Sequence, residues 1–532
     1  MTPVRIVVSL VLAVSGVPAA SPGRTGSAKA DAAAPAAEAV GVVFHDRNRN
    51  GVRDPGEEGL PDVRVSNQHE VVRTDAAGRW RLPVTDDTLL FVIKPRGWMP
   101  PVDKHTHLPR FYYIHKPKGS PPLNCPGVEA TGPLPSSIDF PLQPQNEPDR
   151  FQAILFGDPQ PAEMKEVEFL AHDVVEELVG TRAALGITLG DIVNHCDPTL
   201  YDAVNRTIGL IGIPWYNVIG NHDSNSDMTD DRYSDETFER FYGPDYYSFD
   251  YGPVHFLVLD DITWTGRTSP RGSSYKPALG QGQLDFVKND LSLVPNDQLV
   301  VLLMHVPLSD VKDRRELYRL IEKRPHTLSF SGHTHSQEHR FLTREDDWQG
   351  AEPHHHLIAG AAGGSKWAGA PDELGIPHST MSDGAPNGYF IVTFDGHDAS
   401  IEFKAARRPA DYQMNIYAPE DVPAAQAGQT EVLVNVFAGS ERSKVEMRVG
   451  TDGPWMPMTR TTREDPAMLR LAEAQEKGQA GPIKKLQKPT KTPHIWVCKL
   501  PSRLPAGVTL IQVRTTDMYG KTYQASRVIR IH

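Results

Sequence analysis

Short polar clusters follow five apolar runs in the middle of the chain, and this arrangement constrains the fold more than any other feature of the sequence. Each run has the length and composition of a strand buried on both faces. Between the first two runs, apolar residues from Met164 to Leu178 recur at the spacing of a covering helix. Strands that alternate with helices predict an α/β domain, in which ligands bind at the carboxyl ends of the strands. The runs are FQAILF, AALGITL, GIPWYNVI, LVVLLM and HTLSF, and VHFLVLD is a sixth expected strand.

The polar clusters offer carboxylate, amide and imidazole groups but no thiol. A single Asp or His after a strand is more often a helix cap or a hydrogen-bonded structural residue than a ligand. Five such clusters in succession are hard to explain in that way. Oxygen and imidazole donors without thiolate suit Fe, Zn, Mn or Co, so the pattern predicts a metal site. The clusters contain Asp158 and Gln160, then Asp191, then Asn221, His222 and Asp223, then His305, and finally His333 and His335.

The motifs GDPQ, GDIVNH, GNHD, MHVP and GHTH occur in this order and resemble the five blocks of the calcineurin-like metallophosphoesterases. The resemblance covers residues 150–405 and implies a four-layer α/β/β/α sandwich that hydrolyses phosphate mono- or diesters by attack of a metal-bridging hydroxide. It also implies two divalent or trivalent cations, with Mn, Fe, Zn and Co left undistinguished. By motif, Asp158, Gln160 and His335 would hold the first cation, Asn221, His305 and His333 would hold the second, and Asp191 would bridge both.

The GNHD motif implies catalytic roles for His222 and Asp223. In the family, the histidine of this motif lies beside the scissile phosphate, so His222 is expected to protonate the leaving oxygen. Asp223 is expected to orient the ring and to favour its charged form. Gln160 departs from the family, most of which has histidine there, and an amide oxygen is a weaker ligand than imidazole. We therefore expect the first cation to be held loosely, or without Gln160.

Two loops of small residues are candidates for substrate contacts. In IAGAAGGSKWAG, Gly363 and Gly364 would let backbone amides approach an oxyanion. The following SDGAPNGYF segment adds Asn387 as a candidate. The alternative is a pair of flexible surface loops.

The regions on either side of the α/β domain consist of short β-type runs broken by Pro and Gly. They predict a β-sandwich over residues 40–145 and a β-rich domain over residues 410–532, similar to the β-domains that accompany one bacterial branch of the family. The first region carries a full calcium-loop pattern, which resembles loops in β-sandwich repeats of bacterial surface proteins and implies a structural Ca²⁺. A polar turn without an ion is the alternative. The oxygen donors of the pattern are Asp46, Asn48, Asn50, Asp54 and Glu57.

The N-terminus reads as a signal peptide over residues 1–20, because one early positive charge, the run IVVSLVLAV and the small residues VPAA follow one another. Residues 21–39 are rich in Ala and Pro and predict a disordered linker. We expect a secreted, periplasmic or cell-envelope protein, and an apolar N-terminal strand is the alternative. The apolar run is too short to span a membrane. Three widely spaced cysteines allow at most one disulfide.

The net charge of the chain limits the classes of partner that it is expected to bind. A net charge of −12 disfavours a nonspecific grip on nucleic acid or on an anionic membrane, since both require a basic face. A small phosphorylated substrate is therefore expected, and association with the cell envelope is compatible with export. A second hypothesis is an inactive cell-envelope binding or scaffold protein that uses its β-domains. The complete ligand set and His222 argue against it.

Overall fold

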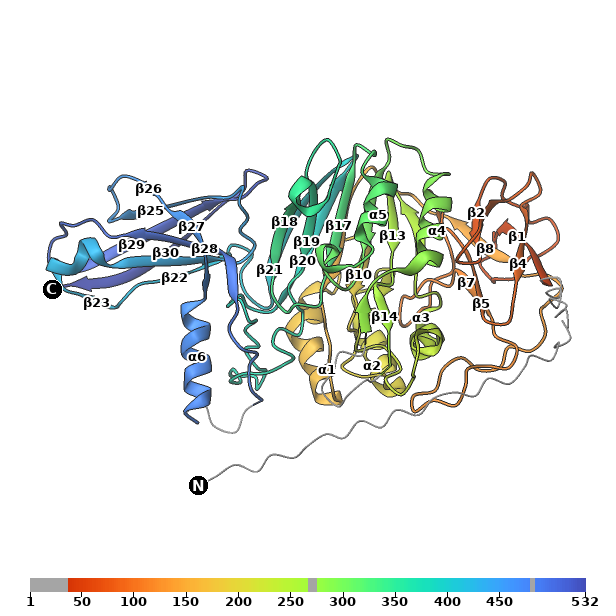
Figure 1. Cartoon of the computed structure of the whole chain (residues 1–532), viewed down its shortest axis with the longest axis horizontal. Coiled ribbons are helices and arrows are strands. Elements are labelled where there is room, and N and C mark those ends of the chain that lie inside the picture. The colour runs from red at the N-terminus through yellow and green to blue at the C-terminus, as the bar shows by residue number, and fades with distance from the viewer. Residues whose placement is uncertain (1–36, 267–274, 479–483) are drawn as a thin grey trace, which may run out of the picture. The chain divides into compact units, whose positions relative to one another are not determined.

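The computed structural model describes residues 37–266, 275–478 and 484–532. The expected signal peptide and most of the expected linker lie outside these residues, so the structure does not bear on them. Ala37–His532 form one compact unit. Along this unit, sheets come first, then a region in which strands alternate with helices, then sheets again (Figure 1).

The first central sheet supplies three of the polar clusters. Its strand order is β11-β10-β9-β20-β21, and the first three of these strands are parallel. The pairing of Leu155 with Ile187, and of Ile187 with Tyr216, aligns the carboxyl ends of β9, β10 and β11. The polar residues that follow these strands therefore start at one edge. The strands are β9 (Arg150–Phe156), β10 (Leu185–Leu189), β11 (Trp215–Val218), β20 (Gly388–Asp395) and β21 (Asp398–Ala405).

The second central sheet supplies the remaining clusters and has the order β12-β13-β16-β17-β19-β18. Strands β13, β16, β17 and β19 are parallel, whereas β12 and β18 pair antiparallel at the two edges. The expected strands from both sheets are confirmed. The strands are β12 (Tyr247–Tyr251), β13 (Val254–Val258), β16 (Leu299–Leu303), β17 (Thr327–Ser331), β18 (Glu338–Leu342) and β19 (His354–Ile358), and a separate ribbon pairs β14 (Ile262–Trp264) with β15 (Tyr275–Pro277).

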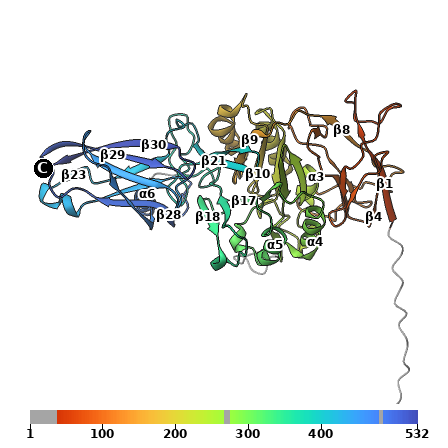
Figure 2. The ribbon, with the colours of Figure 1, turned by 90° about the horizontal axis from the view of Figure 1, so that it is seen from above.

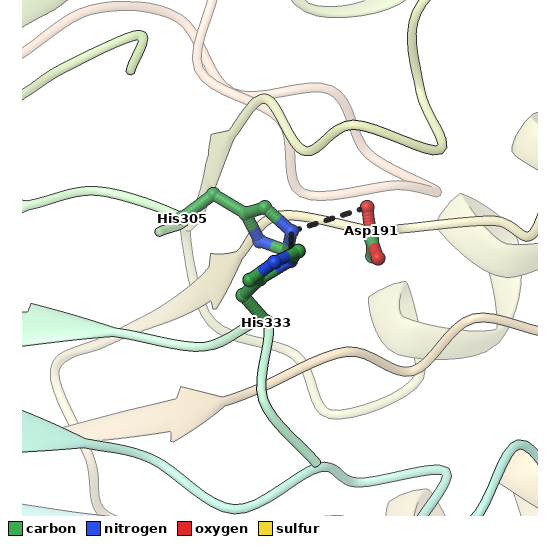
Figure 3. A group of neighbouring side chains, drawn as sticks. All are labelled: Asp191, His305 and His333. Carbon is green, nitrogen blue, oxygen red and sulfur yellow. Dashed lines mark hydrogen bonds and ion pairs between the residues drawn. The ribbon is translucent and has the colours of Figure 1, made fainter. Parts of the chain in front are cut away.

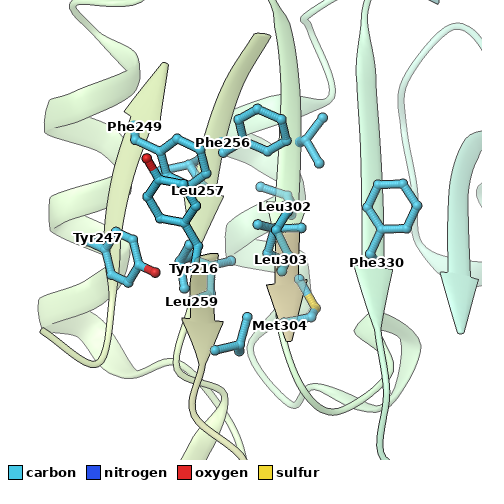
Figure 4. Close-up of a cluster of buried hydrophobic side chains, with 14 of the residues drawn as sticks. Tyr216, Tyr247, Phe249, Phe256, Leu257, Leu259, Leu302, Leu303, Met304 and Phe330 are labelled. Atoms are coloured by element: carbon cyan, nitrogen blue, oxygen red, sulfur yellow. The ribbon is translucent and has the colours of Figure 1, made fainter. Parts of the chain in front are cut away.

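The two central sheets share one apolar core. Tyr216 of the first sheet stacks on Phe249 of the second with ring centroids 3.9 Å apart, and Phe256 stacks on Phe249 in turn (Figure 4). Aliphatic side chains of β16 fill the same space and are fully buried. Apolar burial of this extent is the main favourable contribution to packing of the sheets.

Helices cover the outer face of each central sheet, which completes the predicted four-layer α/β/β/α arrangement. Val167 and Val204 pack in a second core with Phe156 and Trp215 of the first sheet. The helices α4 and α5 lie together on the side of the second sheet (Figure 2). The helices are α1 (Met164–Leu170), α2 (Pro198–Gly209), α3 (Glu236–Tyr242), α4 (Gly280–Leu291) and α5 (Arg314–Ile321), with short 3₁₀ turns at Asp231–Tyr233, Leu308–Asp310 and Arg344–Asp346.

The covering helix expected over residues 164–178 is not one continuous α-helix. After α1 the chain passes through a π-helical stretch, Ala171–Val175, and a 3₁₀ turn, Glu176–Leu178. Its apolar stripe is buried as expected, except that Met164 at the first position is 51% exposed.

The region before β9 contains two four-stranded sheets, with strand orders β4-β1-β8-β6 and β3-β2-β5-β7. Trp80 and Phe140 stack in the core of this region. The strands are β1 (Ala37–His45), β2 (Arg64–Ser66), β3 (Val71–Arg73), β4 (Arg79–Val84), β5 (Thr88–Val92), β6 (Trp98–Met99), β7 (Tyr112–His115) and β8 (Phe140–Pro144).

The region after β21 contains a four-stranded sheet, β22-β24-β28-β27, and a five-stranded sheet, β23-β30-β29-β25-β26, with an apolar core of its own. Between β27 and β28 the chain forms α6 (Pro466–Glu476), and Lys484 after this helix pairs with Glu166 of α1, 2.5 Å away. The strands are β22 (Met414–Tyr417), β23 (Asp421–Val422), β24 (Glu431–Val436), β25 (Lys444–Val449), β26 (Met456–Pro457), β27 (Thr459–Glu464), β28 (Lys491–Lys499), β29 (Gly507–Thr516) and β30 (Thr522–Ile531), with a 3₁₀ turn at Ala424–Gln429.

No helix in the described part of the chain combines the length and the apolar character that crossing a bilayer requires.

Candidate metal centre

The structure brings the polar clusters together at the carboxyl edges of the two central sheets. Their backbones are unusual, because five of the residues have positive φ angles between 34° and 74°. Such conformations are unfavourable for residues with a side chain, and their concentration at one place marks a functional site. Gly190 and Gly332 leave room for close approach, since a Cβ there would lie 2.4 Å from His305 Nδ1 and 2.6 Å from Asp158 Oδ2. The five residues are Asp158, Gln160, Asp191, His333 and His335.

One group of ligand atoms comes from Asp191, His305 and His333 (Figure 3). His305 Nε2 lies 3.3 Å from Asp191 Oδ1 and 3.1 Å from His333 Nδ1. Asn221 Oδ1 lies 3.2 Å from the same His305 nitrogen. These four side chains were predicted to bind the second cation, and the structure places them in contact.

A second group consists of Asp158, Asp191 and His335, whose ligand atoms all lie within 4.8 Å of one another. His335 Nε2 is 3.8 Å from Asp158 Oδ1. Gln160 joins this group, because its Nε2 donates to Asp191 Oδ2 over 2.9 Å. Its Oε1 is buried and has no partner among the described residues. Asp191 belongs to both groups, so the arrangement is that of two adjoining sites with a shared carboxylate.

Hydrogen bonds behind the histidines fix which nitrogen faces the centre. His305 Nδ1 lies 2.8 Å from the Leu189 carbonyl and His335 Nδ1 lies 2.5 Å from the Gly364 carbonyl, so each Nδ1 carries a proton. Both Nε2 atoms then face inward. His333 is turned the other way, with Nε2 against the Tyr275 hydroxyl at 3.2 Å and Nδ1 inward. Partners of this kind orient metal-binding imidazoles.

Burial and mutual charge strongly perturb the pKa values of these groups. Burial raises the pKa of Asp158 to about 7. Burial would lower the pKa of His305, but Asp191 raises it to about 10, and the same pairing holds the pKa of Asp191 below its ordinary value. Burial lowers the pKa of His333 to about 3 and that of His335 to about 4.

This donor set fits two cations. Without a cation, inward-facing nitrogen and oxygen atoms at 3.1 to 3.3 Å require a proton on His305 to keep them together. A cation can take the place of that proton and would also give the unpartnered Gln160 Oε1 a partner. The oxygen and imidazole composition suits Mn, Fe, Zn or Co, as the sequence indicated.

His222 lies at the rim of the centre, but its orientation differs from the expectation. Its Nδ1 contacts the Asn194 carbonyl at 2.7 Å, and its backbone N–H donates to Asp191 Oδ1 over 2.9 Å. Asp223 was expected to orient the ring and to favour its charged form. Both expectations are wrong: the Asn194 carbonyl fixes the ring, and burial lowers the pKa of His222.

Asp223 instead braces the turns that carry the ligands. Its carboxylate accepts hydrogen bonds from the backbone N–H groups of Gly220 at 2.8 Å and Ile192 at 3.1 Å, and from the Tyr201 hydroxyl at 2.9 Å. The turn of GNHD and the turn of GDIVNH are thereby held together. Burial raises the pKa of Asp223 to about 7.

The loop of Gly363 and Gly364 borders the centre, although not as expected. The Gly363 amide donates to the Asp158 carbonyl and the Gly364 amide to the Ala361 carbonyl, so neither is directed at an oxyanion. The loop contributes the Gly364 carbonyl that orients His335. Asn387 is also not a substrate contact, because its buried amide donates to Asp173 Oδ2 and to the Ala362 carbonyl beneath the loop.

Four further residues reach the centre without having been predicted. Lys366 Nζ lies 3.3 Å from His222 Nε2. Tyr275 and Asn194 hold His333 and His222, as described above. Asp261 Oδ2 accepts the Val306 amide over 2.9 Å, and burial raises the pKa of Asp261 to about 7. Only Asp261 gave a usable signal, since it follows the apolar run VHFLVLD in the same way as the recognised clusters follow theirs.

Two further groups of carboxylates lie close together in the described part of the chain, but neither contains a histidine. Asp87, Glu236 and Glu239 surround Lys116, whose Nζ lies 2.7, 2.5 and 2.9 Å from them. The lysine neutralises charge that would otherwise favour a cation. Glu239 also takes part in a group with Asp235 and Asp245.

The calcium-loop residues converge in the loop after β1. Asp46 accepts hydrogen bonds from the backbone of Asn50 and Gly51, at 3.2 and 3.0 Å. Asp54 Oδ2 accepts from the side-chain amides of Asn48 and Asn50, at 2.7 and 2.8 Å. Glu57 closes the loop through the backbone N–H groups of Arg47 and Asp54, at 2.8 and 2.9 Å.

Models of known families match the chain in three consecutive parts. Residues 154–337 match the model of the calcineurin-like phosphoesterase, residues 47–123 match its N-terminal companion, and residues 356–523 match its C-terminal companion. Together with the fold and the site, these matches define a metal-dependent phosphoric ester hydrolase. The chain belongs to the calcineurin-like phosphoesterase family, with the N- and C-terminal domains that accompany it, and the resemblance in the sequence is confirmed.

Two solved structures are similar to this chain. A structure of PhoD has 11% sequence identity and a TM-score of 0.37, covering 75% of this chain and 90% of its own. A purple acid phosphatase, PPD1, from seeds of yellow lupin (Lupinus luteus) has 14% identity and a TM-score of 0.36, covering 65% and 67%. Comparison with curated proteins gave no match.

Proposed function

We propose that the protein is an exported phosphoesterase with two cations that hydrolyses phosphate mono- or diesters. The observation that supports this most strongly is the shared Asp191, which belongs to both groups of ligand atoms. When bound, two cations would supply a water nucleophile of lowered pKa and neutralise charge that develops on the ester oxygens. The remaining contributions come from side chains of the chain itself.

His222 is the residue proposed to exchange a proton with the leaving oxygen. The Asn194 carbonyl holds its Nδ1–H, so Nε2 is the nitrogen available to the substrate. The backbone of His222 is tied to Asp191, which keeps the ring beside the centre. Asp223 does not contact the ring of His222; its carboxylate stabilises the turn of GNHD by accepting the Gly220 backbone N–H.

Two substitutions separate metal binding from catalysis. Asp191→Ala is expected to lower metal content and to abolish activity, because it removes a ligand common to both sites. His222→Ala should retain the metal and lose about 10²- to 10⁴-fold in kcat, the usual contribution of a general acid. Metal analysis and turnover of 4-nitrophenyl phosphate and bis(4-nitrophenyl) phosphate measure both effects, with the exposed Asp202→Ala as a control. Near-normal turnover by His222→Ala would disprove its role.

Export is proposed from the N-terminal sequence and is supported by a disulfide. Cys125 and Cys196 are bonded, which is the single disulfide that the sequence allowed, and such bonds persist in oxidising compartments. The protein recovered from the producing cells should lack about 20 residues at its N-terminus by mass spectrometry. Recovery of the full chain from the cytoplasm would contradict export. Cell-envelope association, proposed with it, predicts recovery with envelope fractions.

A structural Ca²⁺ is proposed for the loop after β1. Support comes from the oxygen side chains of Asp46, Asp54 and Glu57, which converge at the spacing of a calcium loop. Calcium should raise the temperature of unfolding of the wild type but not of Asp46→Ala, since binding to the folded state alone stabilises it. Equal shifts in the two proteins would contradict the site.

A further inference from the structure

Lys366 carries a positive charge to the rim of the metal centre. Its Nζ lies 3.3 Å from Nε2 of His222, the nitrogen that faces the substrate space. Lys366 forms no ion pair with a carboxylate within the described parts of the chain. A lysine ammonium has three N–H donors, and the contact with His222 uses at most one of them.

The loop around Lys366 is built to hold it in place. Lys366 and Trp367 have φ angles of 57° and 54°, and two successive left-handed residues strain the backbone. The buried Trp367 indole donates to the Pro159 carbonyl over 2.8 Å, directly beside the metal ligands of the first motif. Ser365 on the other side donates its hydroxyl to the Thr380 carbonyl over 2.6 Å. These hydrogen bonds on both sides of Lys366 hold the strained backbone in place. A strained conformation that is held in this way indicates a functional position.

The same loop cannot shift without disturbing a metal ligand. Gly363 N–H donates to the Asp158 carbonyl, and the Gly364 carbonyl accepts from His335 Nδ1. A side chain at Gly364 would place its Cβ 1.9 Å from the Ser379 carbonyl oxygen. The loop therefore fixes the distance between the Lys366 backbone and the metal centre.

We propose that Lys366 binds a non-bridging phosphate oxygen of the substrate next to His222 and makes the site selective for dianionic phosphate monoesters over monoanionic diesters. The proposal rests on the proposed function. An added ammonium in a shielded site stabilises a dianion more than a monoanion, because the Coulomb energy scales with the charge of the ligand. Lysine binds phosphate as a point charge, and hydrogen bonds to charged groups are the stronger ones.

The test compares Lys366→Met, Lys366→Arg and, as a matched control on the exposed side of α4, Lys288→Met. Lys366→Met should lose about 10- to 100-fold in kcat/KM for 4-nitrophenyl phosphate and much less for bis(4-nitrophenyl) phosphate. Lys366→Arg should recover most of the loss, and the metal content of all three should equal that of the wild type. An equal loss for both esters, or none, would overturn the proposal.

Calorimetric titration of the metal-loaded proteins with inorganic phosphate provides a readout independent of turnover. Lys366→Met should bind phosphate at least about tenfold more weakly than the wild type, and Lys288→Met should bind it equally well. If the wild type hydrolyses neither ester, the proposed function fails, but the titration still decides whether Lys366 holds a phosphate. Unchanged phosphate affinity in Lys366→Met would refute its role.

Discussion

At the scale of the residue, the geometry of the centre depends on strained backbones at the ligands themselves. Asp158, Asp191 and His335 all have positive φ angles, and each lies two to four residues beyond the end of a strand. The sheets hold the strand ends rigidly, so the short turns can keep conformations that an isolated peptide would leave. A rigid ligand set favours one spacing of the cations over others.

Gln160 offers an amide among the carboxylates and imidazoles of the centre, and it yields a direct prediction. Gln160→His should tighten binding of one of the two cations, because imidazole is a stronger ligand than an amide oxygen. Histidine is also tolerated at positive φ, where Gln160 has 43°. Competition with a chelator, followed by metal analysis, measures the change.

The control for this experiment is Gln160→Met, which keeps the length of the side chain but cannot offer an oxygen. It should lose affinity for the same cation. If neither substitution alters metal binding, Gln160 is not a ligand, and its only role is the hydrogen bond to Asp191.

At the scale of the element, a turn between two strands connects the C-terminal sheets to His335, a candidate metal ligand. The backbone N–H and hydroxyl of Ser382 both donate to the His335 carbonyl, at 3.3 and 3.2 Å. The neighbouring Asp383 accepts from the Gln337 amide at 2.8 Å and contacts His494 Nε2 of β28 at 3.2 Å. The segment that carries His335 is thus held from the C-terminal region.

His494→Ala is expected to weaken binding of the cation held by His335 by about 10- to 100-fold, the usual effect of losing a partner that orients ligands. Turnover at saturating metal should recover, because the ligands themselves remain. Metal titration monitored by activity and by direct analysis measures this. Arg463→Ala, which breaks an exposed ion pair with Glu431 in the same sheet region, serves as the control. A defect that excess metal does not correct would show that the contact is merely structural.

At the scale of the whole molecule, buried charge networks link the N-terminal sheets to the α/β domain. Arg64 of β2 lies 2.6 Å from Asp250 and 2.7 Å from Asp290, and His255 bridges the same two carboxylates at 2.7 and 3.0 Å. All four side chains are largely or fully buried. Removal of one member leaves uncompensated charge, so Arg64→Met should lower the free energy of unfolding by about 3–5 kcal/mol. Urea denaturation measures the change, and Arg81→Met, at an exposed pair with Glu38, is its control.

The network also predicts a pH dependence of stability. Burial would lower the pKa of His255, but Asp290 and Asp250 together raise it above its ordinary value of 6.5. A raised pKa in the folded state means that this stabilisation is complete below pH 6.5 and is lost as the pH rises through the folded pKa. Burial would raise the pKa values of Asp250 and Asp290, yet Arg64 and His255 hold both below 3.8. Their contribution is present above pH 3.8 and is lost as the pH falls further.

Denaturation midpoints measured between pH 5 and pH 10 test this dependence. The fall in stability of the wild type above pH 6.5 should be smaller in His255→Gln, which cannot titrate there. His172→Gln, in an exposed pair with Glu176, should follow the wild type. Identical pH profiles for the wild type and His255→Gln would show that the His255 charge does not contribute.

The polar clusters predicted the metal centre through a local rule: an apolar run buried on both faces ends, and the polar side chains that follow it lie at the edge of the sheet. This rule gave the strands and the candidate site, whereas the four layers and the ligand set from Asp158 to His335 were implied by the resemblance of the motifs to the family. The sequence also allowed one disulfide, which joins Cys125 to Cys196. Local patterns carry this information because strand burial and turn chemistry depend on neighbours in the chain.

Other features depended on contacts between distant segments. The sequence could not show that the Asn194 carbonyl, rather than Asp223, orients His222, or that Lys366 reaches the same ring, because residues 144 positions apart meet only after both sheets have packed. The hairpin of β20 and β21 completes the first sheet by pairing with β9 from far along the chain, and the His494 contact requires the C-terminal sheets to be in place. These contacts depend on packing and on the balance of buried charges. Both are properties of the folded chain and not of any one of its segments.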